Sequence, residues 1–459
     1  MLNNNFLKVT KMKKNMRNTC VLSISTIFVL FGLTGCEFDL DEVLDVHVPG
    51  RVTADALDNP ALAQTLVNSV IGDAECAWAN IVGAASHHSD EWMPGSGNLT
   101  MRNWGQRKIY STDAGYSQSP CSDWGYQLYT PLHTARFQSE DIFTRLAGFE
   151  GVDGKEEMQA TVRAYGGFTL IGLAETWCRQ VIDGGPALTR ADVFKVAEEK
   201  FTDAINLNPS ADIKNMALVG RARARMGLEN WSGAAADAAL VPLDYIKYST
   251  RDGSSGPRYN KIFEGLNNVN DETSKHGSIA DHYRGLSLDA DGMPTQVATD
   301  TPDTRVSVVT QGTLTFDFAT IFYYSDTKHQ SRASDMVMAS GREALMFLAE
   351  TKARSGNTAG AIADMNTLRA AAGVQAITGT PSDIMDLVIE ERRRNFFLEG
   401  GHRLVDMIRF RGTSYNIPFL GEAGSIHPNG VDQTGAEYGT LTCFELPAVE
   451  VNGNPNISQ

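Results

Sequence analysis

The sequence predicts a mainly α-helical fold in which helical hairpins form a scaffold that carries a long irregular insertion with short β-strands. Apolar residues recur at helical spacing in residues 60–86, in about 131–240 and in 342–372. The residues between the last two regions, about 243–335, are rich in Gly, Asp, Ser and Thr and have no sustained period. This composition is typical of loops and short strands, so the hairpins are not expected to form one continuous stack.

The N-terminal residues have the pattern of a secretory signal. Residues 1–17 contain basic residues and no acid, and the apolar stretch Val21–Leu33 is shorter than the roughly 20 residues that a membrane-spanning helix needs. The segment Leu33–Cys36 (LTGC) resembles the lipobox of bacterial lipoproteins, in which the cysteine is acylated and becomes the new N-terminus. We therefore expect residues 1–35 to be a removed signal peptide and Cys36 to carry a lipid. An ordinary secretory signal that ends near a cysteine is the alternative.

The mature chain that this cleavage predicts is strongly acidic. Residues 36–50 form an acidic tether, and removal of the five basic residues in the signal leaves 35 basic against 55 acidic residues, a net charge of about −20. Such a charge repels anionic headgroups and phosphate backbones, so we expect the lipid to be the only membrane contact and no nucleic-acid binding. Residues 51–459 are expected to form a single domain.

A first long helix is expected to begin at Asn59-Pro60, because Asn is a good N-cap and Pro a good first helical residue. The apolar residues that follow at helical spacing are Leu62, Leu66, Val67, Val70 and Ile71. Residues 86–130 are polar and aromatic without a sustained period, and the helical pattern resumes near Pro131.

Helical hairpins are predicted at about 155–240 and at 342–372. The first contains the motif Ala197-x3-Phe201-x2-Ala204-x4-Pro209, which has the spacing of the second helix of a tetratricopeptide (TPR) repeat. Small residues let the paired helix approach closely, and the proline ends the helix. The second hairpin is expected to turn at Gly356-Asn357.

Short strands are expected inside the insertion of about 243–335. The best candidates are Arg305–Val309 and Leu314–Phe318, which are rich in β-branched and aromatic residues.

The most specific stretch of the chain is Val388–Phe410, VIEERRRNFFLEGGHRLVDMIRF. It resembles the signature of the SusD/RagB family, E-R-x-x-E-[aromatic or aliphatic]-x-x-E-G-x-R-x-x-D-[LM]-x-R. The matching residues are Glu391, Arg392, Glu399, Gly400, Arg403, Asp406, Met407 and Arg409. Asn395 stands where a glutamate is usual, and Gly401-His402 makes the segment one residue longer than usual. We therefore expect a bend near Gly400-Gly401.

Other segments resemble the family in the same order along the chain. They are Thr161–Gly167, Asp303–Arg305, Glu343–Asn366 and Phe444–Asn456. With them the resemblance covers about residues 160–456. Members of this family are nutrient-binding outer-membrane lipoproteins that partner TonB-dependent transporters. The resemblance implies a surface-exposed lipoprotein that captures an oligosaccharide or a peptide for a SusC-like transporter.

The charged residues of the motif also have a purely structural interpretation. Acids and arginines three or four positions apart form ion pairs along and between helices. Arginines that clamp a phosphate for catalysis need a glycine-rich loop or a metal site nearby, and the sequence offers neither. We therefore expect no enzyme activity and no cofactor.

Aromatic residues gather where the helical pattern is interrupted. Four of the six tryptophans lie within residues 78–124. Flat rings cover the C–H faces of sugars, while neighbouring carboxylates accept hydrogen bonds from the hydroxyls. Trp78 lies on a helical apolar pattern and is expected in the core. The candidate ligand-binding residues are Trp92, Trp104, Trp124, Tyr126 and Asp90.

The segment His87-His88-x-Asp90-Glu91 contains metal-ligating residue types. Adjacent histidines point in different directions on any regular element, so we expect no metal site there.

Six cysteines are present, of which Cys20 leaves with the signal and Cys36 is lipidated. The other four allow three connectivities in an oxidising compartment. Cys76 and Cys121 flank the irregular aromatic region, where a disulfide would restrain a binding surface. We expect this pairing, which leaves Cys178 with Cys443.

The sequence thus predicts a surface lipoprotein that captures a nutrient for a TonB-dependent outer-membrane transporter. Two alternatives remain open: a scaffold lipoprotein that uses its TPR hairpins for protein–protein assembly, and a lipid-anchored hydrolase. A scaffold has no need of an exposed aromatic cluster, and a hydrolase would turn over a chromogenic sugar.

Overall fold

The computed structural model describes residues 53–117, 119–122, 125–268, 270–317 and 322–457. The chain forms two compact units, residues 1–57 and residues 58–459. In the first unit only the last residues are described, with a short 3-10 helix η1 (Asp55–Leu57). The predicted signal peptide, the acidic tether and Cys36 therefore lie outside the described residues, as does Trp124.

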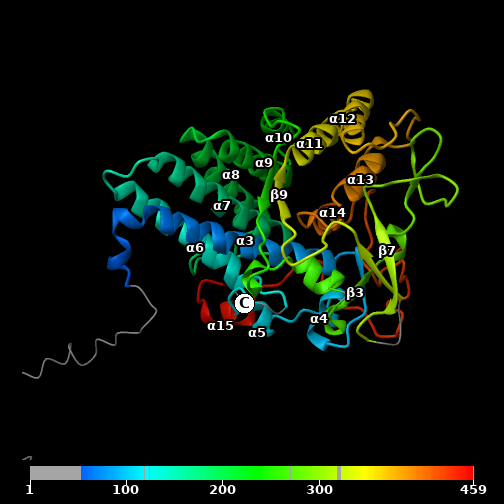
Figure 1. Cartoon of the computed structure of the whole chain (residues 1–459), viewed down its shortest axis with the longest axis horizontal. Coiled ribbons are helices and arrows are strands. Elements are labelled where there is room, and N and C mark those ends of the chain that lie inside the picture. Colours follow the sequence, from blue (N-terminus) through cyan, green and yellow to red (C-terminus); the bar gives the residue numbers. More distant parts are fainter. Residues whose placement is uncertain (1–52, 118, 123–124, 269, 318–321, 458–459) are drawn as a thin grey trace, which may run out of the picture. The chain divides into compact units, whose positions relative to one another are not determined.

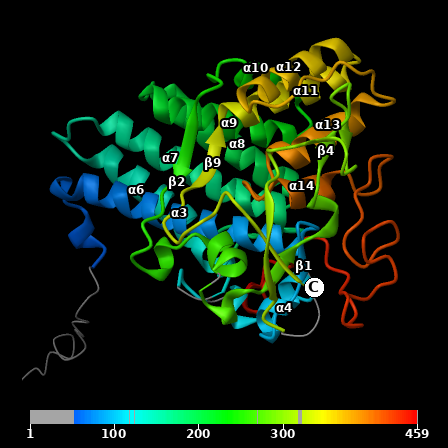
Figure 2. The same cartoon turned by 45° about the vertical axis from the view of Figure 1, so that its right-hand side comes forward.

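A long helix runs through the middle of the second unit (Figures 1 and 2). It follows a 3-10 turn, η2 (Pro60–Leu62), in which the side chain of Asn59 accepts a hydrogen bond from the amide of Ala61 at 3.0 Å. The helix α3 (Ala63–His88) is almost completely buried from Ala74 onward. It packs against α6, α7 and α14, so it forms the axis of the core. The predicted cap at Asn59 is confirmed for η2, whereas α3 itself begins three residues after Pro60, at Ala63.

The first helical group follows the prediction closely. Its helices are α6 (Tyr129–Gly148), α7 (Lys155–Thr176), α8 (Arg190–Asn206), α9 (Ala211–Gly227) and α10 (Trp231–Ala238). Ala197, Phe201 and Ala204 of the TPR-like motif are fully buried. A Cβ on Gly220 would lie only 2.2 Å from the ring of Phe201, so the glycine permits the close approach of α8 and α9.

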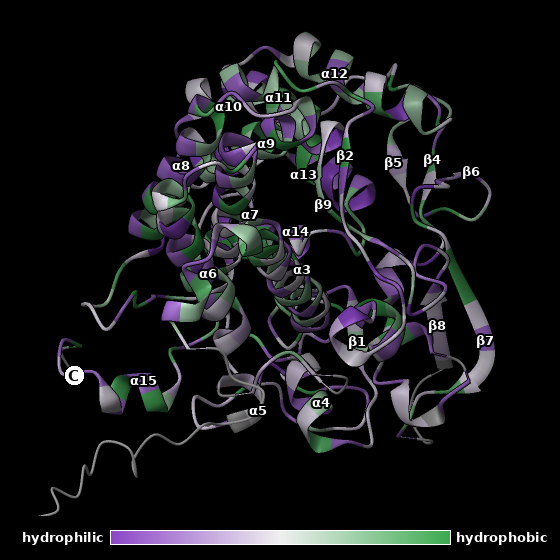
Figure 3. Ribbon diagram, turned by 60° about the vertical axis from the view of Figure 1, so that its left-hand side comes forward, coloured by the Kyte–Doolittle hydropathy of each residue, from purple (hydrophilic) through white to green (hydrophobic). Residues whose placement is uncertain are grey.

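The second helical group comprises α11 (Gly341–Arg354), α12 (Thr358–Ala371), α13 (Ile384–Asn395) and α14 (His402–Arg409), with α15 (Ala448–Gly453) near the C-terminus. The side chain of Ser340 caps α11. The turn between α11 and α12 contains Gly356 with a φ of +77° and Asn357 as the next N-cap, as the sequence predicted. Figure 3 shows hydrophilic and hydrophobic residues alternating along the helices of both groups, as expected for helices packed on one face.

Short antiparallel sheets connect the helices. The strands are β1 (Trp92–Pro94), β2 (Ile246–Ser249), β3 (Gly277–Ile279), β4 (Ser287–Leu288), β5 (Pro294–Thr295), β6 (Thr301–Pro302), β7 (Val308–Leu314), β8 (Phe322–Asp326) and β9 (Met336–Ser340). They pair as β1 with β3, β2 with β9, β5–β4–β6 and β7 with β8. The β2–β9 pair therefore brings the two ends of the insertion together, and β3, within the insertion, pairs with the segment after α3.

Short helices complete the second unit. They are α4 (Leu99–Gly105), α5 (Ala114–Ser117), η3 (Gly256–Arg258), η4 (Phe263–Asn267), η5 (Glu272–Ser274) and η6 (Asp281–Tyr283).

The predicted bounds of two strands in the insertion were wrong. A single strand, β7, spans Val308–Leu314, whereas Arg305 lies in a turn. The cause is electrostatic, because the guanidinium of Arg305 is turned inward to Asp303 and Glu391. The strand that pairs with β7 is β8, which begins only at Phe322.

Both disulfides join the two predicted pairs of cysteines. Cys76 of α3 is bonded to Cys121, and Cys178 is bonded to Cys443. Next to the second bond, the amide of Cys178 donates a hydrogen bond to the carbonyl of Phe444 at 2.9 Å. The C-terminal segment is thereby fixed to the end of α7.

Candidate functional site

The family-like motif forms two helices joined by a sharp bend. The first, α13, ends at Asn395, and α14 begins at His402. Gly400 and Gly401 between them have φ values of +57° and +68°, in the left-handed region where glycine has no steric penalty. The predicted bend near these glycines is confirmed.

Glu391 lies at the centre of the charged network in this motif. Its side chain is fully buried and binds two arginines from other elements: Nη1 of Arg305 donates to Oε2 at 2.6 Å, and the guanidinium of Arg369 binds the same carboxylate. Burial alone would raise the pKa of Glu391, but these two arginines outweigh it and hold the pKa below its usual range. Glu391 thereby ties α13 to α12 and to the insertion.

Other charged residues of the motif also form ion pairs, either with one another or with residues outside the motif. Arg392 binds Asp406 at 3.0 Å, and Arg409 binds Glu350 of α11 at 2.7 Å. Lys328 and Arg342 share the carboxylate of Glu399. These partners satisfy the charges internally, which agrees with the structural interpretation of the motif.

Asp90, a predicted ligand residue, belongs to this structural network. Its oxygens accept hydrogen bonds from Arg403 at 2.7 and 2.5 Å and contact the ring of His282 at 3.1 Å. The side chain is 7% exposed. With its oxygens occupied in this way, the carboxylate holds α14 to the end of α3 and is not presented to a ligand.

Two of the predicted stacking tryptophans lie in the core. Trp92 is 0% and Trp104 is 2% exposed. The indole of Trp92 packs on the ring of His87, with centroids 4.6 Å apart, and Trp104 packs edge-to-face on Tyr126 and Phe444. Neither ring offers a face to solvent, so in this structure they cannot form the predicted stacking platform.

Tyr126, the remaining described candidate, lines a cavity with residues of the insertion. This cavity, which we call the Tyr259 cavity, has a volume of about 200 Å³. Its lining residues are Met101, Gly125, Tyr126, Tyr259, Lys261, Glu264, Gly265, Asp271, Ser274, His276 and Arg332. The segment that brings Gly125 and Tyr126 to the cavity begins at the disulfide-bonded Cys121.

The Tyr259 cavity combines an aromatic ring with polar groups. The guanidinium carbon of Arg332 lies 4.6 Å from the ring centroid of Tyr259, and its Nε binds Glu264 at 2.6 Å. The side chain of Arg332 is 45% exposed. The buried hydroxyl of Tyr126 has no hydrogen-bond partner among the described residues. The cavity therefore offers a ring face, a carboxylate and unused hydrogen-bonding groups within one small space.

The sequence alone did not indicate Tyr259, Glu264 or Arg332. All three lie in the insertion: Tyr259 follows a Gly- and Ser-rich stretch, Glu264 lies in η4 and Arg332 lies in a turn. Nothing in the local sequence separates Tyr259 from any other loop tyrosine. Its importance follows only from its place in the same cavity as Tyr126, which lies more than 100 residues earlier in the chain.

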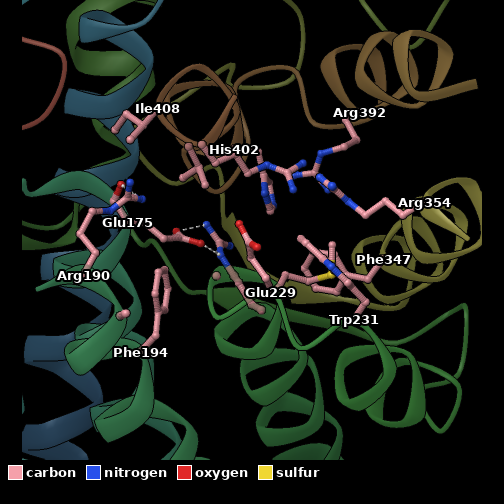
Figure 4. A pocket seen from close by; sticks show the side chains of 16 residues that line it. Glu175, Arg190, Phe194, Glu229, Trp231, Phe347, Arg354, Arg392, His402 and Ile408 are labelled. Carbon is pink, nitrogen blue, oxygen red and sulfur yellow. Dashed lines mark hydrogen bonds and ion pairs between the residues drawn. The ribbon is translucent and has the colours of Figure 1, made fainter. Parts of the chain in front are cut away.

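A second and larger cavity lies between the two helical groups (Figure 4). This cavity, which we call the Arg190 cavity, has a volume of about 360 Å³. Its lining residues are Glu175, Arg190, Ala191, Phe194, Arg223, Met226, Gly227, Glu229, Trp231, Phe347, Arg354, Arg392, His402, Val405, Ile408 and Arg409. It shares no lining residue with the Tyr259 cavity.

No group of three or more His, Cys, Asp or Glu side chains suitable for a metal ion occurs in the part of the chain that the structure describes. His87 and His88 are both buried, and burial lowers the pKa of each well below its usual value. Each ring packs on aromatic neighbours: His87 on Trp92, and His88 on Phe444.

Glu91 is a buried acid whose raised pKa should make the stability of the protein depend on pH. Its carboxylate is buried and accepts a hydrogen bond from the amide of Leu398 at 2.8 Å. Burial raises the pKa of Glu91 from 4.5 to about 7, and the neighbouring Asp90 also raises it. Because the folded-state pKa lies above the unfolded one, the stabilising contribution is full below pH 4.5 and is lost as the pH rises through about 7.

Glu91→Gln should therefore flatten this part of the pH profile. Between pH 4.5 and 7 the free energy of unfolding of the wild type should fall relative to the variant by about 3 kcal/mol. Urea unfolding at a series of pH values measures this difference. The exposed Glu150→Gln is the control, and parallel wild-type and Glu91→Gln profiles would show that Glu91 ionises normally.

This chain resembles known proteins both in sequence and in fold. Residues 298–457 match the sequence model of the SusD family. No curated protein matches the chain.

Several solved structures share the fold. A SusD-like carbohydrate binding protein from Bacteroides vulgatus aligns with a TM-score of 0.64 at 14% identity, over 87% of this chain and 97% of that chain. A SusD-like protein from Bacteroides fragilis aligns with a TM-score of 0.66 at 13% identity, over 91% of this chain and 98% of that chain. Surface glycan-binding protein A from Bacteroides thetaiotaomicron, solved with laminarihexaose, aligns with a TM-score of 0.58 at 13% identity, over 86% of this chain and 98% of that chain. The fold is thus shared along almost the whole length of each of these structures.

Proposed function

We propose that this chain, which belongs to the SusD family, captures an oligosaccharide at the cell surface and passes it to a SusC-like TonB-dependent transporter. In this proposal it is a binding protein and not an enzyme. The family match supports the proposal, and so does the resemblance of the fold to a glycan-binding protein solved with a bound oligosaccharide.

The Tyr259 cavity is the observation that carries the proposal. A sugar ring presents apolar C–H groups to a flat aromatic face and hydroxyls to carboxylates and amides. Tyr259 supplies the face, while Glu264, which binds Arg332 through Oε1, lines the same cavity and supplies an acceptor. The guanidinium of Arg332 covers the ring of Tyr259, so a sugar that stacks there displaces this exposed side chain.

Tyr259→Ala should weaken glycan binding without unfolding the protein. Loss of one stacking ring is expected to cost about 1–3 kcal/mol, a scale measured for bases on aromatic side chains, or about a 5- to 150-fold rise in Kd. Affinity electrophoresis against a panel of soluble polysaccharides identifies a ligand, and calorimetry with an oligosaccharide of that polymer, beginning with laminarihexaose, gives the Kd.

Tyr248→Ala is the matched control, because Tyr248 is 39% exposed on β2 and does not line the cavity. An unchanged Kd in Tyr259→Ala would place the glycan site elsewhere. If the protein binds no glycan and instead retains peptides, the oligosaccharide proposal is wrong.

Membrane attachment in this proposal depends on the lipid at Cys36. No helix among the described residues is long and apolar enough to cross a membrane. The acidic residues 36–50 disfavour binding to anionic headgroups, which leaves the acyl chains to hold the protein at the outer membrane. Confinement to the membrane plane raises the effective concentration of the protein near a transporter in the same membrane.

A further inference from the structure

The Arg190 cavity lies where the two helical groups meet. Figure 4 shows its labelled side chains converging from opposite sides, with Arg190 and Phe194 facing Arg354 and Arg392. Arg190 and Phe194 belong to α8, Arg354 to α11 and Arg392 to α13. A volume of about 360 Å³ is within the range of cavities that bind small molecules.

One side of the cavity is apolar and aromatic. Phe194 and Phe347 are buried, whereas Trp231, the first residue of α10, is partly exposed. The guanidinium carbon of Arg354 lies 4.1 Å from the ring centroid of Trp231. An aromatic face beside a guanidinium suits a flat or ring-shaped ligand that carries an anionic group.

Arg190 brings a charge to the cavity without an ion-pair partner. Its Nε and Nη2 donate to the carbonyls of Ala174 and Glu175 at 2.7 and 3.0 Å. No salt bridge of Arg190 and no hydrogen bond of its Nη1 occurs within the described residues. A buried or half-buried guanidinium that lacks a carboxylate leaves strong donors free for an anion.

Arg392 has a further unused donor. Its Nε and Nη2 bind Asp406, but its buried Nη1 makes no hydrogen bond within the described residues. The nearest carboxylate oxygen, on Glu350, lies 3.8 Å from Nη1. That carboxylate already binds Arg409 at 2.7 and 2.8 Å.

Arg190 has no counter-ion within the described residues, whereas Arg392 is paired with Asp406 and only its Nη1 lacks a hydrogen bond. Glu175 is engaged by Arg223 at 2.6 and 2.7 Å. The imidazole of His402 adds no charge, because burial and the surrounding arginines lower its pKa well below the usual value. Glu229, in the turn between α9 and α10, is an exposed carboxylate at the cavity with no salt bridge within the described part of the chain.

We propose that the Arg190 cavity binds a sugar carboxylate, that is, a uronic acid residue, as a site separate from the Tyr259 cavity. The carboxylate of the ligand accepts hydrogen bonds from Arg190 and Arg392, and its ring lies against Trp231. This proposal goes beyond the capture of a glycan at Tyr259 and does not depend on it, because the two cavities share no lining residue.

Calorimetry on the full soluble chain with three small probes tests this site. Sodium glucuronate should bind, whereas glucose, which lacks the carboxylate, should not. Sodium acetate, which lacks the ring, should bind at least about 10-fold more weakly than glucuronate, because it keeps the contacts of the carboxylate but loses those of the ring. No binding of glucuronate, or equal binding of glucose, would overturn the proposal.

Two substitutions with opposite expected effects locate the binding. Arg190→Gln should weaken glucuronate binding by about 10-fold or more, and the exposed Arg179→Gln is its control. Glu229→Gln removes a repulsive charge and should tighten binding by about 2- to 5-fold, with Glu150→Gln as its control. An unchanged Kd in Glu229→Gln would show that glucuronate binds outside this cavity, even if Arg190→Gln fails to fold. Tyr259→Ala should leave glucuronate binding unchanged, so failure of this site is distinguishable from failure of the glycan site.

Discussion

Glu391→Gln should reduce the free energy of unfolding by about 3–5 kcal/mol, because it leaves two buried arginines without their shared counter-ion. Arg305 and Arg369 are 5% and 0% exposed, and both bind this carboxylate. Arg305 retains Asp303, but Arg369 makes no other ion pair within the described residues. An amide has no charge to offset a guanidinium that is buried in this way.

Urea unfolding followed by circular dichroism measures this loss. The matched control is Glu198→Gln on α8, whose ion pair with Arg225 has both side chains partly exposed, at 26% and 19%. An exposed pair contributes about 0–1 kcal/mol, so the control should change the stability little. Equal losses in the two variants would mean that Glu391 does not organise the charged network.

Removing the Cys178–Cys443 disulfide should have an effect of similar size. The bond closes a loop of 265 residues, and the loop-entropy relation gives about 5.6 kcal/mol for such a constraint on the unfolded chain. Replacing both cysteines with serine should lower the midpoint of thermal unfolding and release the segment around Phe444 from the end of α7.

The Cys76–Cys121 pair provides the internal comparison. Its sequence separation of 45 residues corresponds to about 4 kcal/mol in the same relation. The double serine variant of the longer loop should therefore be the less stable of the two. If both variants keep the wild-type stability, the disulfides do not form in the protein.

The helical scaffold was predictable because its information is local. Small residues at Ala197 and Ala204, the N-cap at Asn59 and the turn at Gly356 each act within a few positions, and the structure has helices and turns where they indicate. The bend at Gly400 was predictable for the same reason. The strands of the insertion were placed less well, because Arg305 is held by Glu391, 86 residues later in the chain.

The candidate site was less predictable because burial is not encoded locally. Trp92 and Trp104 lie in an irregular, polar stretch of sequence, yet the C-terminal segment and the insertion cover them. Tyr126 was identified, whereas Tyr259 was not, because the cavity exists only where the two segments meet. Asp90 has the chemistry of a sugar ligand but is already neutralised by Arg403.

The Cys76–Cys121 bond makes the complete Tyr259 cavity depend on the compartment in which the chain folds. It fastens the start of the segment that carries Gly125 and Tyr126 to α3, on which the rest of the second unit is built. Disulfides form in oxidising compartments and not in the cytoplasm. In the export that we propose, one wall of the Tyr259 cavity therefore stays untethered until the chain enters an oxidising compartment, and the cavity is complete only from that point.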